Sequence, residues 1–290
     1  MHAFASNRVV ILRYHSVRPP QPAVESYMPA GITHSPETFL AQIEYVAKTC
    51  HPVSIRDLPG FIEGSIAIPE RAVLITFDDG FQDNYEVAAP ILEQYGLRGV
   101  FYICTSSVEG RPLWIVRLRH WSVAAGINRA RFLEVSAHCA SLTDSRREEF
   151  LAGLEHANSA SDSFTMTWAQ CRHLIERGHT IGSHTVNHPN TAKIPRGELI
   201  VEMEASKKIL ETRLGTTIDD FSYPNPILEP HWDQSTIEVC RRAGYKTAVT
   251  STEGSVTTGT DPFAIPRRFM ADNLTDFAWS LEMAFTGWHR

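Results

Sequence analysis

Cysteine is scarce in this chain, and its few cysteines show no pattern. The five are scattered over 290 residues, and no two of them form a CxxC pair. Zinc knuckles and disulfide frameworks need closely or regularly spaced cysteines, so neither kind of site is expected. The scatter is typical of a protein that stays in a reducing compartment.

Long apolar runs are also missing. No stretch of about 18 apolar residues occurs, so we expect no membrane span. Near the amino terminus, only four apolar residues separate Arg8 from Arg13, too few for the core of a signal peptide. The chain as written is therefore predicted to be cytoplasmic.

The chain also lacks an excess of basic residues. The chain has 27 Lys and Arg against 33 Asp and Glu, a formal net charge of −6. Nucleic acid is therefore not an expected partner. With 43% hydrophobic residues, the chain can bury a sizeable core, and its length suits one α/β barrel. We predict a single domain over residues 1–290, and the oligomeric state is left open.

Seven short apolar runs predict β-strands. They are continuous rather than alternating, as expected for strands covered on both faces. The predicted strands are Val9–Tyr14, Ala72–Phe77, Gly99–Cys104, His179–Ser183, Asp219–Tyr223, Tyr245–Thr250 and Phe263–Arg267. Helical segments lie between them, so parallel crossovers and a closed or nearly closed α/β barrel are predicted. Residues 105–165 are long and polar, and we interpret them as an insertion with helices near Leu113–Ala125 and Asp144–His156.

Two adjacent carboxylates, Asp78 and Asp79, stand where an apolar segment ends at Gly80. Neighbouring acids repel each other and lose solvation there, and a bound cation is the usual compensation. Adjacent residues of a regular strand point to opposite faces, so we expect Gly80 to let the chain turn sharply. Taken alone, the pair could also be a turn with solvated acids.

Two histidines four positions apart, His184 and His188, follow a later apolar segment. Pro189 disfavours helical geometry at His188, so a short turn that brings both rings inward is expected. In isolation such histidines are more often surface residues. Together with one carboxylate they make a three-ligand metal site with an open position, which leaves the second carboxylate for proton transfer.

Polar residues also follow other predicted strands. His15 and Tyr223-Pro224 stand at carboxyl ends, like the acids and histidines above. That edge is where parallel α/β barrels build active sites. A backbone contact is the alternative role for His15, and a structural turn is the alternative for Tyr223-Pro224.

Two motifs identify a family resemblance. TFDDG at 76–80, followed by FQDN at 81–84, and HTIGSHTVNHPN at 179–190 resemble the polysaccharide deacetylases, carbohydrate esterases with a NodB-homology domain. The opening LRYHSV at 12–17 is similar to the permuted subgroup that contains poly-N-acetylglucosamine deacetylases. The resemblance implies a distorted (β/α)7 TIM-like barrel and one divalent metal ion. Zinc is the first expectation, and Co²⁺, Ni²⁺ and Fe²⁺ are the alternatives.

The resemblance also implies a role for each motif residue. Asp79, His184 and His188 would be the metal ligands. Asp78 would be the general base, and His15 would be the general acid that protonates the departing amine.

The remaining implied roles belong to a further motif of the family, which corresponds to residues 223–225 here. Tyr223, Pro224 and Asn225 would form the oxyanion and substrate-binding loop, with the backbone N–H of Asn225 as donor. Two features depart from the family pattern. Pro226 stands where glycine is usual, and the arginine that orients the base is not at its usual place. Arg267, at the end of the last predicted strand, could supply that charge.

The predicted function is therefore a metal-dependent hydrolase. It would remove the N-acetyl group from an amino sugar, in a glycan or a glycan precursor, and release acetate. One alternative is a metal hydrolase of the same fold that cleaves a different bond, in an O-acetyl ester or a non-sugar amide. A second alternative is a catalytically silent carbohydrate-binding barrel.

Overall fold

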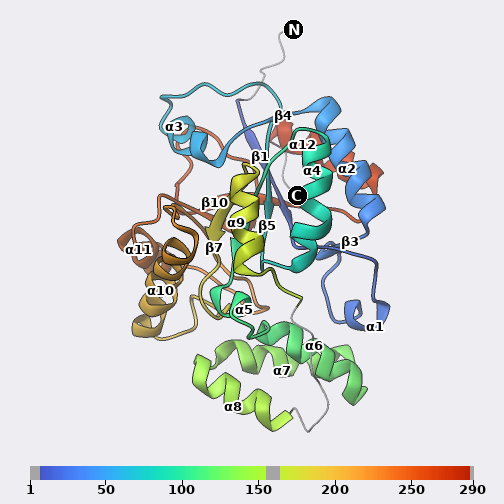
Figure 1. Ribbon diagram of the computed structural model, residues 1–290, viewed down its shortest axis with the longest axis vertical. Helices are drawn as coiled ribbons and strands as arrows, with labels where there is room; N and C mark the ends of the chain where they lie inside the picture. Colours follow the sequence, from blue (N-terminus) through green and yellow to red (C-terminus); the bar gives the residue numbers. More distant parts are fainter. Residues whose placement is uncertain (1–6, 155–163, 288–290) are drawn as a thin grey trace.

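Seven parallel strands form a closed barrel in the computed structural model, which describes residues 7–154 and 164–287 (Figure 1). Around the barrel the order is β1, β10, β9, β8, β7, β6 and β5, and β5 pairs with β1 to close the ring. The strands are β1 (Val9–Tyr14), β5 (Ala72–Phe77), β6 (Gly99–Ile103), β7 (Thr180–Ser183), β8 (Asp220–Ser222), β9 (Thr247–Glu253) and β10 (Ile265–Phe269). This confirms the (β/α)7 TIM-like barrel, and each predicted strand end lies within three residues of the observed one.

Three two-residue strands were not predicted. β4 (His51–Pro52) pairs with β5 outside the closed ring, and β2 (Ser16–Val17) pairs with β3 (Thr33–His34) in a separate small sheet. A strand of two residues shows no periodicity, so the sequence carries no signal for it.

The strands are apolar on both faces because each face is covered. Along β1, alternate residues enter different apolar clusters. Val9 and Ile11 pack with Leu74, whereas Val10 and Leu12 belong to the larger cluster shared with the helices. Successive side chains of a strand point to opposite faces, so this division marks the inner and outer sides of the barrel.

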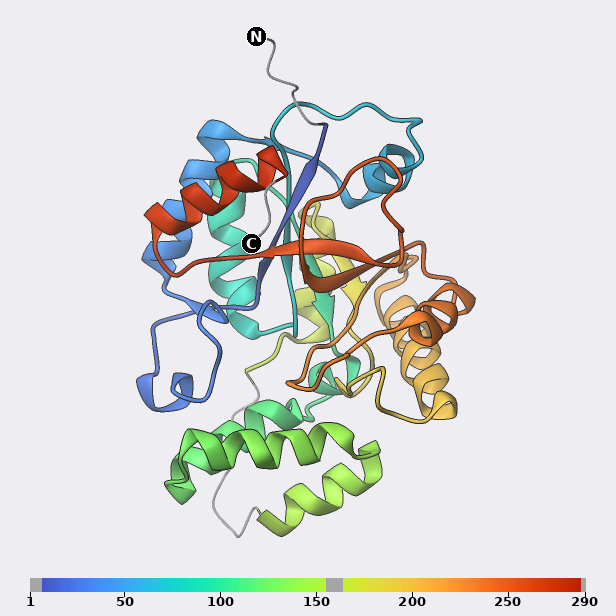
Figure 2. The same ribbon diagram turned by 180° about the vertical axis from the view of Figure 1, so that it is seen from behind.

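Helices cover the outside of the barrel, and α2 lies beside α12 (Figures 1 and 2). They begin at residues suited to the role: Ser35 caps α2, and Thr167 forms a capping box with Gln170 at the start of α9. The helices outside the 105–165 segment are α1 (Pro22–Glu25), α2 (Pro36–Thr49), α3 (Leu58–Ile62), α4 (Ala89–Gln94), α9 (Trp168–Glu176), α10 (Arg196–Leu214), α11 (Gln234–Arg242) and α12 (Leu274–Thr286). A 3₁₀ turn (Ile55–Asp57) precedes α3, and a π-helical turn (Asn84–Ala88) precedes α4.

Part of the connection between β6 and β7, the 105–165 segment, places helices α6, α7 and α8 at one end of the barrel (Figures 1 and 2). It contains α5 (Thr105–Val108), α6 (Trp114–Ala125), α7 (Arg129–Ser141) and α8 (Asp144–Leu154). α6 and α8 match the two predicted helices, although residues 155 and 156 of the second lie outside the described residues. α7 was missed. Helices α6, α7 and α8 share a small apolar cluster that includes Leu118, Phe132 and Leu151, and Tyr27 and Phe81 join it from outside the segment.

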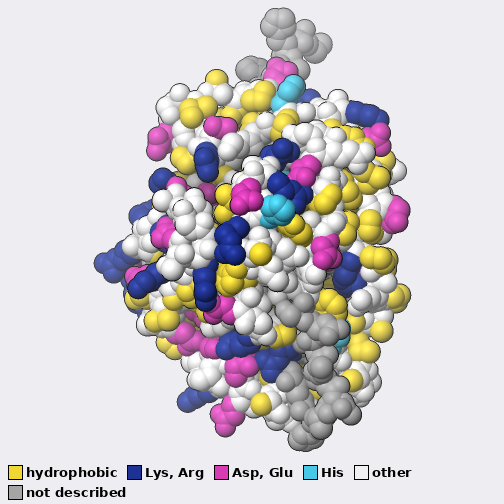
Figure 3. Space-filling view, in the orientation of Figure 1, with side chains coloured by type: hydrophobic (Ala, Val, Ile, Leu, Met, Phe, Trp, Pro, Cys, Tyr) yellow, Lys and Arg dark blue, Asp and Glu magenta, His cyan; other side chains and the backbone are white. Residues whose placement is uncertain are grey.

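In the described parts of the chain, no helix combines the length and the apolar character that crossing a membrane requires. Acidic and basic side chains are interspersed on the face shown in Figure 3.

Candidate metal centre and catalytic site

The two adjacent carboxylates reach one cavity because the backbone turns between them. The Asp78 N–H still donates to the Tyr14 carbonyl, 3.0 Å away, as a continuation of β5. Asp79 then adopts a left-handed conformation with φ 76°, and Gly80 follows with φ 74°. The prediction that Gly80 makes the turn is therefore incomplete, because the turn begins at Asp79. A left-handed non-glycine residue costs on the order of 1–3 kcal/mol, and such strain is concentrated at functional sites.

Asp79, His184 and His188 are buried and converge on one point. Their potential ligand atoms lie within 4.8 Å of one another. Asp79 Oδ1 is 3.5 Å from His184 Nε2 and 3.3 Å from His188 Nε2. In a tetrahedral site with bonds of about 2.0–2.1 Å, neighbouring ligand atoms are about 3.3 Å apart. The three side chains therefore have the spacing of ligands to a single ion.

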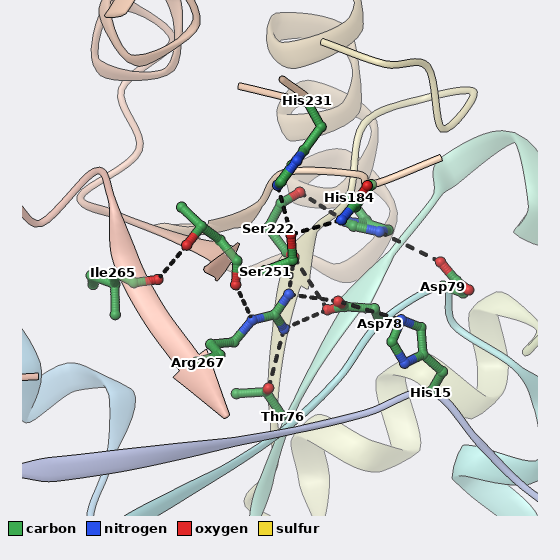
Figure 4. Close-up of polar contacts among 12 residues, drawn as sticks. His15, Thr76, Asp78, Asp79, His184, Ser222, His231, Ser251, Ile265 and Arg267 are labelled. Atoms are coloured by element: carbon green, nitrogen blue, oxygen red, sulfur yellow. Dashed lines mark hydrogen bonds and ion pairs between the residues drawn. The ribbon is translucent and has the colours of Figure 1, made fainter. Parts of the chain in front are cut away.

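A hydrogen bond at Nδ1 of His184 determines the protonation of the other ring nitrogen, Nε2, which faces Asp79. His184 Nδ1 lies 2.7 Å from the Ser222 carbonyl oxygen, which can only accept, so this nitrogen carries the proton (Figure 4). In the neutral ring, Nε2 is then a lone pair directed at a carboxylate oxygen. Two acceptors facing each other without a donor repel, whereas a cation between them attracts both.

The hydrogen-bond inventory agrees with a cation at this point. Among the described residues, Asp79 Oδ1 and His188 Nδ1 are buried without a hydrogen-bond partner. Burial lowers the pKa of His188, so its ring is neutral and able to act as a ligand near pH 7. For Asp79, burial would raise the pKa, but positive charge at the imidazoles holds it well below its usual range. With both rings neutral, a cation between them would supply that positive charge. The donor set fits a divalent ion.

The His188 loop is a turn, as the sequence predicted, and a glutamate from α10 holds it. His188 has φ 55°, and its N–H donates to Thr185 Oγ1, 3.0 Å away. Glu202 Oε2 accepts the N–H groups of Val186 and Asn187 at 2.8 and 2.9 Å. The buried carboxylate therefore fixes the two residues that precede His188, a predicted metal ligand.

Asp78 is bound on its other side by Arg267. Arg267 Nη1 donates to Oδ1 at 2.8 Å, and Nη2 donates to Oδ2 at 2.6 Å (Figure 4). The Ser222 hydroxyl adds a third donor, 3.2 Å from Oδ1. Burial alone would raise the pKa of Asp78, but Arg267 and the nearby His184 hold it well below its usual range. Asp78 is therefore ionised at neutral pH and has a fixed orientation.

His15 lies across the cavity from Arg267. Its Nε2 is 3.9 Å from Asp78 Oδ2, and its buried Nδ1 has no hydrogen-bond partner among the described residues. Burial lowers the pKa of His15 to about 4, so the ring is neutral near pH 7.

The Tyr223-Pro224-Asn225 loop borders the same cavity, but its three residues differ in what they can do. The Tyr223 hydroxyl donates to the Phe263 carbonyl at 3.0 Å, which makes this side chain structural. Pro224 does not line the cavity. Asn225 does, and its Nδ2 donates to Ser251 Oγ at 2.8 Å. Within the described residues its backbone N–H donates to no protein acceptor, so it is free to meet a ligand.

The cavity has a volume of about 280 Å³ and joins the predicted residues. Those that line it are His15, Asp78, Asp79, His184, His188, Tyr223, Asn225 and Arg267. Sequence reasoning missed several neighbours: Arg119, Glu202, Ser222, His231 and Ser251. Ser222 could have been found, because it directly precedes Tyr223 at a strand end. The others lie in segments without a motif.

Comparison with known proteins gives one family and one fold. The sequence model described as polysaccharide deacetylase matches residues 66–248. YxkH of Bacillus subtilis (strain 168), whose name assigns it to the polysaccharide deacetylases, is 22% identical over 198 residues, which are 68% of this chain and 51% of that protein. The chain thus spans about half the length of this curated relative.

Two solved structures illustrate the shared fold. One is the deacetylase PplD of Streptococcus pyogenes in complex with acetate, with a TM-score of 0.69 and 20% identity, covering 96% of this chain and 98% of that one. The other is IcaB from Ammonifex degensii, with a TM-score of 0.66 and 20% identity, covering 97% of each chain. At these identities the likeness establishes a common barrel and leaves the chemistry to the residues.

Proposed function

The chain belongs to the polysaccharide deacetylase family, and we propose that it is a metal-dependent hydrolase that removes the N-acetyl group from an amino sugar in a glycan or glycan precursor. Membership of the family implies a hydrolase acting on acetylated carbohydrate. The metal dependence, the amide bond and the role of each residue are our proposal.

The observation that carries the proposal is that two neighbouring carboxylates have different partners. Asp79 faces two imidazole nitrogens at 3.3 and 3.5 Å, which is an arrangement for a cation. Asp78 faces a guanidinium and points an ionised oxygen toward the same cavity. A sugar-binding module has no need for a base beside a metal site.

Asp79, His184 and His188 would hold the ion. One carboxylate oxygen and two imidazoles suit Zn²⁺, and also Fe²⁺, Co²⁺ or Ni²⁺. When bound, such an ion acidifies water and polarises the acetyl carbonyl. The backbone N–H of Asn225 would supply a further donor to the oxygen that becomes negative, an effect worth about 10²–10³-fold.

Asp78 would take the proton of the attacking water. Its low pKa makes it a weak base, so it is suited to a water molecule that is more acidic than bulk water. Arg267 would keep both carboxylate oxygens in place throughout, so no reorientation precedes the reaction. General base catalysis contributes typically about 10²–10⁴-fold.

His15 would deliver a proton to the departing amine. With its pKa lowered to about 4 by burial, the ring holds no extra proton at neutral pH. Its Nε2 is 3.9 Å from Asp78 Oδ2, which is too far for a direct hydrogen bond, so the proton that Asp78 removes would reach His15 through one bridging water molecule. The amide C–N bond then breaks as His15 protonates the nitrogen, and acetate and a free amine are released.

The test is a substrate panel with matched variants. Wild-type protein purified without chelator is incubated with N-acetylglucosamine oligomers, acetylated xylan and small acetamides, and acetate and free amine are both measured. We expect equal amounts of acetate and amine from the N-acetyl sugars, and about one divalent ion per chain. Asp78→Asn should keep the ion and lose turnover.

Other outcomes would replace the proposal. Acetate from xylan without amine from the N-acetyl sugars would identify an O-acetyl esterase. Turnover confined to the small acetamides would identify a non-sugar amidase. Glycan binding without turnover, even after metal is added, would leave a silent binding barrel.

A further inference from the structure

A second cavity adjoins the catalytic one. It has a volume of about 190 Å³ and lies between the loop that contains Arg18, the turn that contains Phe81, and helix α6. Ile32 and Arg119 line both cavities. A ligand whose acetamido group reached Asp79 could therefore extend past Arg119 into this second space.

Arg119 is the unusual residue at this junction. Its side chain comes from α6 in the 105–165 segment, and it is only 8% exposed. Across the described residues it makes no hydrogen bond or ion pair, and its buried Nε has no acceptor. Burial lowers the pKa of Arg119 to about 10. An arginine remains charged at neutral pH even so, and a buried charge without a counter-charge is costly.

The other buried arginines of the described residues each have a carboxylate nearby. Arg147 is 3.1 Å from Asp144, Arg267 is 2.6 Å from Asp78, and Arg268 is 3.6 Å from Glu253. The protein therefore compensates buried guanidinium groups elsewhere. Arg119 is the exception among these buried arginines, and it lines both cavities.

Neighbouring acids do not compensate Arg119. The proposed function assigns the charge of Asp79 to the metal ion. Asp83 and Glu86 line the second cavity, but among the described residues neither forms an ion pair with Arg119. Asp83 instead accepts the N–H of Val17 at 3.1 Å and the Ser16 hydroxyl, and Glu86 accepts Gln82 Nε2 at 2.6 Å. An anion from outside is thus the missing partner.

We propose that Arg119 binds an anionic substituent, a phosphate or a carboxylate, carried by the N-acetylated sugar. The inference rests on the proposed function, because it places the acetamido group of the same sugar beside Asp79. A guanidinium binds either anion through two parallel hydrogen bonds. The apolar side chains of Val24, Met28 and Phe81 line the second cavity and limit water there, which strengthens the pairing.

The test measures binding, so it does not depend on turnover. Full-length protein carrying Asp78→Asn is titrated by calorimetry with N-acetylglucosamine, N-acetylglucosamine 1-phosphate and N-acetylmuramic acid. A charge-assisted pair corresponds to about a 10- to 100-fold gain in affinity for an anionic sugar over the neutral one. The two anionic sugars distinguish phosphate from carboxylate.

Variants at Arg119 then test whether this residue causes the gain in affinity for the anionic sugar. Arg119→Gln should remove the preference for the anionic sugar, so that the neutral and the anionic sugars bind with similar affinity. Arg119→Lys should keep part of it, because it retains the charge but not the two-pronged geometry, and it carries the test if Arg119→Gln does not fold. Arg131→Gln, an exposed arginine of α7, is the matched control and should bind like the parent.

Failure of this inference is distinguishable from failure of the proposed function. Equal affinity of the parent protein for the neutral and both anionic sugars would overturn the role of Arg119, even if wild-type protein releases acetate. A preference lost in Arg119→Gln would establish the anion site, even if no acetate were ever released.

Discussion

Asp78 and Asp79 are adjacent in the chain, both are buried, and both have a lowered pKa, yet their surroundings are opposite. Both oxygens of Asp78 accept hydrogen bonds from Arg267, which carries a permanent charge. Asp79 Oδ1 instead faces two imidazole nitrogens and, among the described residues, receives no hydrogen bond. Asp78 has its partners within the protein, whereas Asp79 has the surroundings expected of a ligand to the proposed cation.

This contrast teaches how one motif can supply two functions. A change of backbone conformation at Asp79, with φ 76°, directs its side chain toward the histidines. The guanidinium of Arg267, buried and held by the Thr250 carbonyl at 2.8 Å, reaches only Asp78. The proposed difference between base and ligand therefore arises from the turn at Asp79 together with partners outside the motif.

The largest expected effect separates the two carboxylates. Asp78→Asn and Asp79→Asn should each lower kcat/KM by about 10³-fold or more, since one removes the base and the other a ligand. Only Asp79→Asn should also lose the ion. Activity assays combined with elemental analysis check this, and loss of the ion from both variants would contradict the division of roles.

The next prediction concerns the partner of Asp78. Arg267→Gln should lower kcat/KM by about 10–100-fold, as for other residues that orient a catalytic group. It should also cost about 3–5 kcal/mol of stability, because it leaves a buried carboxylate uncompensated.

The same variant has a pH signature with a definite sign. Burial raises the pKa of Asp78, and without Arg267 less opposes that rise. The carboxylate would then be protonated at a higher pH, so the acid limb of kcat/KM should move upward, with activity recovering as pH increases. A profile with the wild-type acid limb would show that Arg267 does not control Asp78.

For the proposed metal site that contains Asp79, the next prediction concerns Glu202 and the affinity for the ion. Glu202→Gln replaces one acceptor oxygen of the carboxylate that binds the Val186 and Asn187 N–H groups. We expect about 10–100-fold weaker metal binding, the usual cost of disturbing the residues that orient ligands.

The control for this variant is Glu204→Gln, an exposed residue of the same helix. It should bind metal like wild type in an equilibrium titration. Similar losses in both variants would mean that α10 acts through its charge rather than through the loop.

The smallest effect is expected at the rim of the cavity. Ser251 accepts Asn225 Nδ2 at 2.8 Å and lies 2.7 Å from His231 Nε2. Ser251→Ala removes hydrogen bonds worth about 0.5–1.5 kcal/mol each, so we predict a several-fold lower kcat/KM with unchanged metal content. A loss comparable with Asp78→Asn would give Ser251 a direct catalytic role.

Much of the fold could be predicted from the sequence, because barrel strands are continuous apolar runs with helices between them. What the sequence did not reveal has a physical reason in each case. The α7 helix (Arg129–Ser141) mixes charged and apolar residues with only a weak apolar face, and its core appears only when α6 and α8 are placed beside it.

The residues of the site likewise fall into those that the sequence predicted and those that it did not. Asp78, Asp79, His184 and His188 lie in compact motifs, and the structure brings them to one cavity together with His15 and Arg267. Glu202 and Arg119 carry no local signal, since a glutamate or arginine on a helix is ordinary until its burial is known. Tyr223 was expected to bind substrate, but its hydroxyl is occupied by the Phe263 carbonyl.

The most direct test of the central claim is an equilibrium titration of Zn²⁺, after chelation and dialysis, into wild-type, Asp78→Asn and Asp79→Asn proteins. We predict one ion per chain with similar affinity in wild type and Asp78→Asn, and at least about 100-fold weaker binding in Asp79→Asn. Equal binding by all three proteins, or weakened binding by Asp78→Asn alone, would contradict the account.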